Sequence, residues 1–257
     1  MDSLQSQQKV FHLLWFKLRL ITFLQESFSF GCLRGFKHFE LYLRGKEELL
    51  LRVYNEKPDS STRASYSATG EATKRFQIAN SNNIDETFVH LPPASPCDNE
   101  MEKSTDQTAF LIAGYARYKC PLVWLRSNHE RILGVRYKSE LDYPLRLKTT
   151  SSWKTSDVHV YDIVEELLSV ANNTPVSNPF AIDHTYFDTL SIEESIVCSS
   201  ALLNFLNKLF QQERPYKNEI WKDMQALMKR HLNEYQELVS FTGSQDNMNY
   251  VTSIKAS

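Results

Sequence analysis

The sequence predicts an α+β fold in which a mainly antiparallel sheet is combined with an N-terminal helix and a C-terminal layer of two or three helices. Two patterns lead to this prediction. Within residues 1–150, apolar and polar residues alternate in several short runs, which is typical of strands with one buried face. After residue 156, apolar residues recur every three or four positions, as on amphipathic helices. The 257-residue chain is 42% hydrophobic and 23% charged, so it can bury a core without disulfides or metals.

An N-terminal helix is predicted over residues 3–26, where apolar residues follow a helical spacing. Its apolar run, residues 10–24, contains Lys17 and Arg19 and is shorter than the roughly 20 residues that cross a bilayer. The same two charges interrupt any apolar core of a signal peptide, and no small-residue cleavage site follows them. We therefore expect no membrane span and a cytoplasmic or nuclear protein.

The predicted sheet begins with a hairpin of residues 39–43 and 49–53, joined through Gly45 and Lys46. Short runs rich in β-branched and aromatic residues predict further strands. They are residues 108–118, 121–126, 131–137 and 143–148. Two segments rich in Ser, Thr and Pro hold too few apolar side chains to offset the entropy of ordering, so we expect flexible loops there. These are residues 55–74 and 92–107.

Residues 156–241 are predicted to form a separate C-terminal helical region. Within it, Ser191 and Glu194 fit a capping box that opens a helix running to about residue 213. Pro215 separates this helix from a last one, which is expected to end near residue 241 because Gly243 follows. Residues 242–257 are then expected to be a flexible tail.

The last two helices carry the candidate partner-binding surface. In the final helix, two series of residues seven apart, offset by three, follow the a/d pattern of a coiled coil. They are Trp221, Met228 and Tyr235, and Met224, His231 and Leu238. The preceding helix is apolar over more than one neighbour needs, and its second side is formed by Leu202, Phe205 and Leu209. Either the sheet or a partner protein could cover that side. The predicted partner-binding residues are Leu202, Phe205, Leu209, Trp221, Met228 and Tyr235.

The sequence lacks the well-marked catalytic motifs. Its seven glycines form no phosphate-binding loop, and no nucleophile elbow or HExxH metal helix occurs, so we expect a non-catalytic protein without a cofactor. Asp and His residues gather in two short segments that could supply metal ligands, although capping of helix starts explains such residues equally well. They are Asp157, His159 and Asp162, and Asp183, His184 and Asp188.

The four cysteines, Cys32, Cys97, Cys120 and Cys198, are widely spaced and are interpreted as reduced thiols. Cys97 lies in a predicted exposed loop and is the candidate for a reactive one. Residues 114–126, GYARYKCPLVWLR, resemble the central strand pair of the E2-like conjugation enzymes of autophagy, and residues 180–189 fall where their catalytic loop would follow. Those enzymes place a cysteine after His-Pro, whereas His184 is followed by Thr185 here. The resemblance therefore implies an E2-like or RWD-like binding fold without conjugation chemistry.

Charge is segregated along the chain, although the net charge is only −2. Residues 117–154 hold nine Lys or Arg against three acids, whereas residues 155–207 hold eight acids and no Lys or Arg. The candidate basic surface consists of Arg117, Lys119, Arg126, Arg131, Arg136, Lys138, Arg146 and Lys148. This surface could bind nucleic acid or an acidic partner, or it could simply face the acidic helices or solvent.

The sequence as a whole predicts a protein–protein interaction subunit or adaptor of an intracellular multiprotein complex. The absent catalytic motifs, the wide apolar helix faces and the segregated charge support this prediction. Two alternatives stay open: a thiol-dependent E2-like protein that uses Cys97 or Cys120, and a nucleic-acid-binding protein that uses the basic segment.

Overall fold

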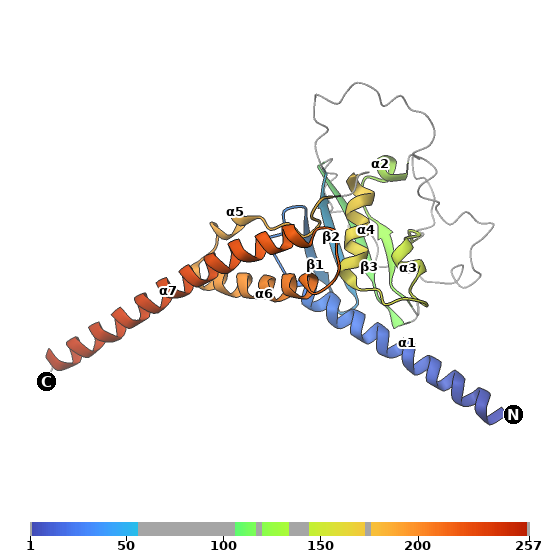
Figure 1. Ribbon diagram of the computed structural model, residues 1–257, viewed down its shortest axis with the longest axis horizontal. Coiled ribbons are helices and arrows are strands. Elements are labelled where there is room, and N and C mark those ends of the chain that lie inside the picture. The colour runs from blue at the N-terminus through green and yellow to red at the C-terminus, as the bar shows by residue number, and fades with distance from the viewer. Residues whose placement is uncertain (1, 56–105, 117–119, 134–143, 173–175, 256–257) are drawn as a thin grey trace, which may run out of the picture. The chain divides into compact units, whose positions relative to one another are not determined.

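The computed structural model describes residues 2–55, 106–116, 120–133, 144–172 and 176–255 (Figure 1). Of residues 2–14, 16 and 241–255, only the backbone is described. The chain divides into two compact units. The sheet unit comprises residues 1–32 and 38–176, and the helical unit comprises residues 33–37 and 177–257.

The sheet unit confirms the predicted α+β class. Its helices are α1 (Asp2–Gly31), α2 (His129–Leu133), α3 (Lys148–Ser151) and α4 (Val160–Asn172). Its strands are β1 (Phe39–Arg44), β2 (Glu48–Tyr54), β3 (Gln107–Ala113) and β4 (Leu122–Leu125). They form a four-stranded antiparallel sheet in the order β1-β2-β3-β4. The predicted hairpin is confirmed, and Gly45 takes the positive φ of 72° that its tight turn requires. The unit also includes α4, which the sequence pattern groups with the later helices.

The chain leaves the sheet after β4, earlier than predicted. Residues expected to begin a strand at 131 lie in α2, and residues 134–143 are outside the described part. Asn128 has a positive φ of 57°, and its side-chain amide donates to the Gln107 carbonyl (2.6 Å), which turns the chain into α2. Of the described residues in the expected strand at 143–148, none is in a strand; Leu145 N–H donates to the Val123 carbonyl (2.7 Å), and Lys148 begins α3. The two predicted loops lie almost entirely outside the described residues.

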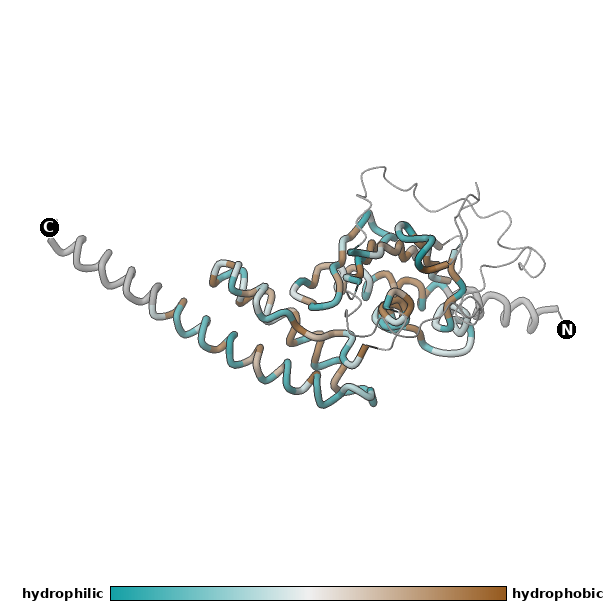
Figure 2. The backbone as a smooth tube through the Cα atoms, turned by 90° about the horizontal axis from the view of Figure 1, so that it is seen from above, coloured by the Kyte–Doolittle hydropathy of each residue, from teal (hydrophilic) through white to brown (hydrophobic). Residues whose placement is uncertain are grey.

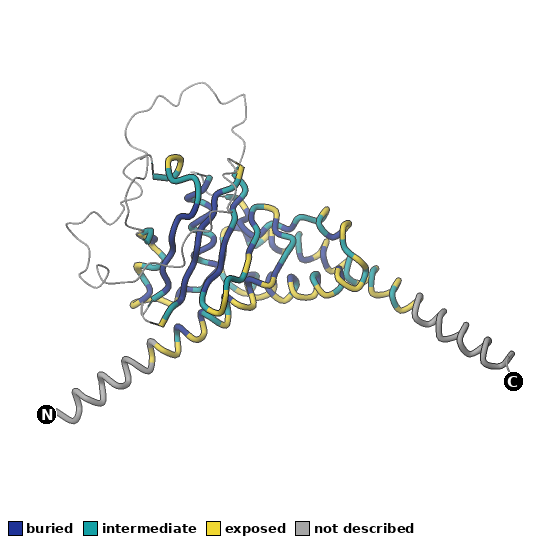
Figure 3. Tube along the Cα trace, turned by 180° about the vertical axis from the view of Figure 1, so that it is seen from behind, coloured by how far each residue is buried: buried dark blue, intermediate teal, exposed yellow. Residues whose placement is uncertain are grey.

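One face of the sheet packs against α1 and α4 (Figure 1). Strand residues of one parity point to this face, and they are fully buried against apolar residues of both helices. They include Leu41, Leu51, Val53, Phe110 and Val123. On the opposite face, Leu111 and Ala113 of β3 and Leu122 and Trp124 of β4 form a second buried cluster with Tyr115 and Cys120. The central strands are therefore buried on both faces, as Figure 3 shows.

The helical unit contains α5 (His184–Phe187), α6 (Ile192–Phe210) and α7 (Lys217–Lys255). The predicted capping box is confirmed, because Ser191 accepts from Glu194 N–H and the Glu194 carboxylate accepts from Ser191 N–H. The helix expected to end near residue 241 continues through Gly243 to Lys255. A glycine inside a helix costs only about 1 kcal/mol, and no proline follows, so Gly243 does not stop α7.

The helical unit contains a cluster of four packed aromatic rings. Phe36 packs edge-on against Phe205, with ring centroids 5.8 Å apart, and Phe180 contacts the same ring at 5.5 Å. Tyr216, just before α7, contacts Phe180 at 6.3 Å. The segment around Phe36 also forms an antiparallel bridge with Ile182, so this short stretch belongs to the helical unit. Within the described residues, no helix is long and apolar enough to cross a membrane.

Candidate protein-binding surface

Helices α6 and α7 form an antiparallel hairpin. At one end the rings of Phe210 and Trp221 lie 5.3 Å apart, and at the other the Ser195 hydroxyl donates to the Glu234 carboxylate (2.6 Å). Between these ends, the Ser199 hydroxyl and His231 Nδ1 are 2.8 Å apart. Both serines are buried, so their hydrogen bonds avoid the cost of an unpaired polar group in the helix seam. The pairing fixes the register of the two helices.

The broad apolar side of α6 is covered inside the helical unit. Leu202 and Leu209 have no exposed surface and Phe205 is 8% exposed. Phe205 contacts Phe36 and Phe180, and α6 packs along α7, whose Ile220 and Leu227 are also buried. These three predicted partner-binding residues therefore pack in the core of the unit. The sequence left open whether the sheet or a partner protein covers this side of α6. In the structure, rings of the helical unit cover Phe205.

Helix α7 carries two apolar stripes instead of one seam. Met224 and Leu227 are buried, and with His231 they form the stripe that faces α6. The three remaining predicted residues are exposed: Trp221 by 44%, Met228 by 47% and Tyr235 by 53%. Their series continues with Leu232 (52%) and Val239 (50%), so apolar side chains recur at the four-three spacing of a heptad along an exposed line. Figure 2 shows hydrophobic turns recurring along the otherwise hydrophilic α7.

Residues of α6 widen this exposed stripe. Phe210 touches Trp221, and Leu203 and Ile196 precede Phe210 by seven and fourteen residues, so all three lie on one line of α6. All are half-buried. We call this two-helix surface the hairpin face. It consists of Ile196, Leu203, Phe210, Trp221, Met228, Leu232, Tyr235 and Val239.

The remaining side of α7 is held by the loop that precedes α6. The Asp223 carboxylate accepts from the Asn178 amide (3.0 Å) and Ile182 N–H (3.4 Å). Burial raises the pKa of Asp223, and these hydrogen bonds, together with His184, offset part of the rise. Two turns later, Arg230 binds Asp188 at 2.5 Å. Because α6 and this loop occupy two other sides of α7, neither covers the exposed apolar stripe.

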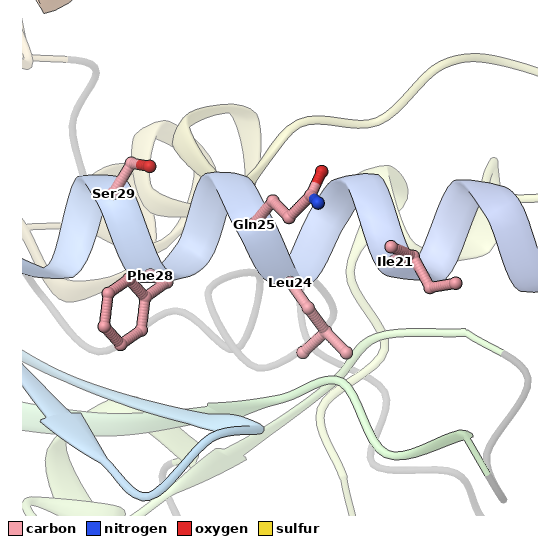
Figure 4. Close-up of a pocket in the computed structure, with 5 residues that line it drawn as sticks. All are labelled: Ile21, Leu24, Gln25, Phe28 and Ser29. Carbon is pink, nitrogen blue, oxygen red and sulfur yellow. The ribbon is translucent and has the colours of Figure 1, made fainter.

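A second exposed apolar patch lies on α1 in the sheet unit. Leu18, Ile21 and Phe28 are more than half exposed. Figure 4 shows the shallow pocket that adjoins them, lined by Ile21, Leu24, Gln25, Phe28 and Ser29. Leu24 and Phe28 point to one side of the helix, and Gln25 and Ser29 point to the other. No sequence motif marked this patch.

The Asp and His residues of the two candidate metal segments have structural roles. In the sheet unit, His159 Nδ1 lies 2.7 Å from Glu26 Oε1 of α1, and Asp162 accepts from His159 N–H (2.9 Å) at the start of α4. In the helical unit, Asp183 caps α5 by accepting from Thr185 N–H (3.0 Å), while Asp188 binds Arg230. Among the described residues, no group of three His, Cys, Asp or Glu is arranged to hold a metal ion.

Of the described thiols, Cys32 is exposed, whereas Cys120 and Cys198 are partly buried and poorly set up for nucleophilic chemistry. Burial raises the pKa of Cys120, an effect that Lys154 only partly offsets. Burial and the nearby Glu194 raise the pKa of Cys198. A raised pKa keeps a thiol protonated near neutral pH, and a protonated thiol is a poor nucleophile. Cys97, the predicted reactive thiol, lies outside the described residues.

Four of the eight residues of the candidate basic surface belong to the described part of the chain. Arg117, Lys119, Arg136 and Lys138 lie outside the described residues. Arg126 is 8% exposed, because it follows Trp124 by two positions and shares its buried side of the sheet. Arg131 donates to the Ala171 carbonyl (2.7 Å), which lies in the last turn of α4 and favours a cation. Of the four described members of this set, Arg131, Arg146 and Lys148 are exposed and Arg126 is buried.

The fold and this surface define an α+β protein with a C-terminal helical hairpin that exposes an apolar face. By sequence, the chain belongs to the family described as Domain of unknown function (DUF7886), whose model matches residues 95–233. No curated protein and no solved structure matches the chain. The match covers β3, β4 and α6, and it includes the hairpin face up to Leu232.

Sequence reasoning identified part of this face. It singled out Trp221, Met228 and Tyr235, but it missed Leu232 and Val239. The missed signal was available, since each follows a predicted residue by four positions and completes the four-three spacing. The assignment of Met224 and His231 to the same stripe hid it, because those two residues face α6.

Proposed function

We propose that this protein is a non-catalytic interaction subunit or adaptor, and that the hairpin face binds a partner protein in a hetero-oligomeric intracellular complex. The observation that carries the proposal is the exposed line of large apolar side chains on α7, at heptad spacing, beside a half-buried line on α6. Contiguous exposed apolar surface of this kind is rare on a protein that works alone and marks interaction sites. We place the complex in the cytoplasm or nucleus.

Fully burying a large apolar side chain is worth about 1.5–3 kcal/mol, so covering the exposed half of each stripe residue contributes roughly 1 kcal/mol. Met228, Leu232 and Tyr235 form the centre of the stripe and are each about half exposed. A helix of a partner that lies along the hairpin face would cover all three at once. This is the recognition mode in which an amphipathic helix places its apolar face in a hydrophobic groove.

The proposal is tested with a triple variant, Met228→Gln, Leu232→Gln and Tyr235→Gln, in affinity capture from cells. Glutamine keeps helix propensity while removing the apolar surface, so the fold should be retained. We expect partner recovery to fall at least about tenfold, because roughly 3 kcal/mol of apolar burial is lost. Val197→Gln is the matched control, since Val197 is 68% exposed on α6 and is not part of the hairpin face. Equal partner recovery with the triple variant and the wild type would contradict the proposal.

The two alternatives have weaker support. Thiol chemistry requires a thiolate, whereas burial raises the pKa of both Cys120 and Cys198, and a fast reaction of Cys97 or Cys120 with a mild alkylator would favour it. Nucleic-acid binding requires a run of exposed cations, whereas Arg126 is buried and Arg131 binds the end of α4. A salt-dependent shift of an oligonucleotide by the purified protein would favour that alternative.

A further inference from the structure

Two lysines follow the exposed edge of the hairpin face. Lys222 and Lys229 are seven residues apart, each comes directly after a stripe residue, and both are exposed. In a heptad, the position after a core residue flanks the seam and faces the corresponding flank of the opposing helix. The next position of this edge is Gln236, so the edge carries positive charge and no carboxylate.

The charges of these two lysines have no partner in the part of the chain that the structure describes. Within the described residues, neither Lys222 nor Lys229 takes part in an ion pair or hydrogen bond. Other cations of the same helix are paired: Lys217 with Glu213 at 3.1 Å, and Arg230 with Glu234 at 2.8 Å. Among the described Lys and Arg residues of α7, the two without a partner are therefore those that border the apolar stripe.

We propose that the hairpin face takes an amphipathic helix from another protein whose apolar stripe is flanked by acidic residues seven positions apart. This inference rests on the proposed function and adds the chemistry of the partner. Seven residues of helix span about 10.5 Å, so carboxylates at that spacing on the bound helix would lie opposite both lysines. Opposite charges at flanking positions select the partner and its orientation.

A second copy of this chain matches the lysines less well. The outer edge of α6, which a second copy would present, holds exposed residues three positions before each α6 member of the face. They are Glu193, Ser200 and Asn207. That edge supplies one carboxylate for two lysines, whereas an acidic helix supplies one for each.

The test is a fluorescence anisotropy titration of the full chain with two labelled three-heptad peptides. Both peptides carry Leu at the a and d positions, and their flanking positions are all Glu in one and all Lys in the other. We expect the Glu peptide to bind about tenfold more tightly than the Lys peptide at low salt, because two exposed pairs are attractive in one case and repulsive in the other. This preference should shrink in 0.5 M NaCl, where charges are screened within about 4 Å.

The double variant Lys222→Glu and Lys229→Glu should reverse the preference, and a gain of binding to the Lys peptide cannot come from unfolding. Binding of both peptides with equal affinity would overturn the inference about charge while leaving the proposed function in place. Binding of neither peptide by a chain that sediments as a dimer would overturn it in favour of a second copy. Binding of neither peptide by a monomeric chain would overturn it and remove support from the proposed function as well.

Discussion

The helices at the two ends of the chain both expose apolar residues, and they differ in how the charges beside those residues are used. On α1, Arg19 donates to the carbonyls of Trp153 and Ser156 at 2.5 Å, and Glu26 pairs with His159. These charged groups fasten α1 to its own unit. On α7, Lys222 and Lys229 border the stripe without such contacts among the described residues.

The two apolar surfaces also differ in extent. The α1 patch is a shallow pocket lined by five residues of one helix. The hairpin face combines residues of two helices at a repeating spacing, which a partner helix can follow over several turns. The comparison teaches that exposed apolar residues become a candidate binding surface when they repeat in register over two helices. The expected outcomes below test that distinction, beginning with the largest effect.

The largest effect is expected from removing the aromatic cover of α6. Phe205→Ala should lower the free energy of unfolding by about 3–5 kcal/mol, because the lost ring contacts leave a cavity between Phe36 and Phe180. Urea denaturation followed by circular dichroism measures the change. Tyr235→Ala is the comparison, since its side chain is half exposed and should change stability by less than about 0.5 kcal/mol. Similar losses for both variants would mean that the hairpin face is packed rather than open.

A smaller loss is expected in the seam between α6 and α7. Ser195→Ala removes the 2.6 Å hydrogen bond to Glu234 from a buried hydroxyl, which should cost about 1 kcal/mol. Thermal unfolding of the variant measures this loss. Ser200→Ala is the matched control, because Ser200 is exposed on the same helix and alanine has the higher helix propensity. If Ser200→Ala were the more destabilising of the two, the register of the hairpin would be contradicted.

The pairing of α1 with α4 should make stability depend on pH. The hydrogen bond with Glu26 raises the pKa of His159 despite its partial burial, so the folded state holds the proton more tightly than the unfolded state. The stabilisation is therefore complete below pH ~6.5, the unfolded pKa of histidine, and is lost as the pH rises through the higher folded value. Because both side chains are about one-third exposed, it should stay below about 1 kcal/mol.

Unfolding measured from pH 5.5 to 8.5 in the wild type and in Glu26→Gln tests this expectation. The wild type should lose stability across that range relative to the variant. A difference between the two proteins that stayed constant with pH would show that the pair is not titrating.

The smallest effect is expected from polar substitution of the α1 patch. Leu18→Gln combined with Phe28→Gln should change stability by less than about 0.5 kcal/mol, because both side chains are more than half exposed. Partner capture should be unchanged, in contrast to the triple variant of α7. Loss of the same partners from the α1 variant would show that the two terminal helices are equivalent surfaces, against the comparison made above.

Much of the fold could be predicted from local pattern. The first hairpin, β3, β4 and the capping box at Ser191 follow from alternation, turn residues and capping chemistry, which depend on near neighbours. The segment after β4 could not be predicted in this way. There a single side chain, Asn128, reaches back to the Gln107 carbonyl and turns the chain, and this contact joins residues that are 21 positions apart.

The candidate site was predicted in part for the same reason. A heptad pattern gives the spacing of apolar residues but not which helix face meets a neighbour, so the residues facing α6 and the exposed stripe were merged. Arg126 shows a related limit. Its place in a basic segment suggests an exposed cation, yet its parity with Trp124 puts it on a buried face of β3 and β4.

The central claim, that the hairpin face is the surface that binds a partner, is tested most directly by site-specific photo-crosslinking in cells. A photoreactive amino acid replaces Leu232 in one protein and Val197 in another, both being more than half exposed and on different sides of the hairpin. The account predicts a discrete crosslinked product from position 232 and none from position 197. Crosslinking from position 197 with none from position 232 would contradict it.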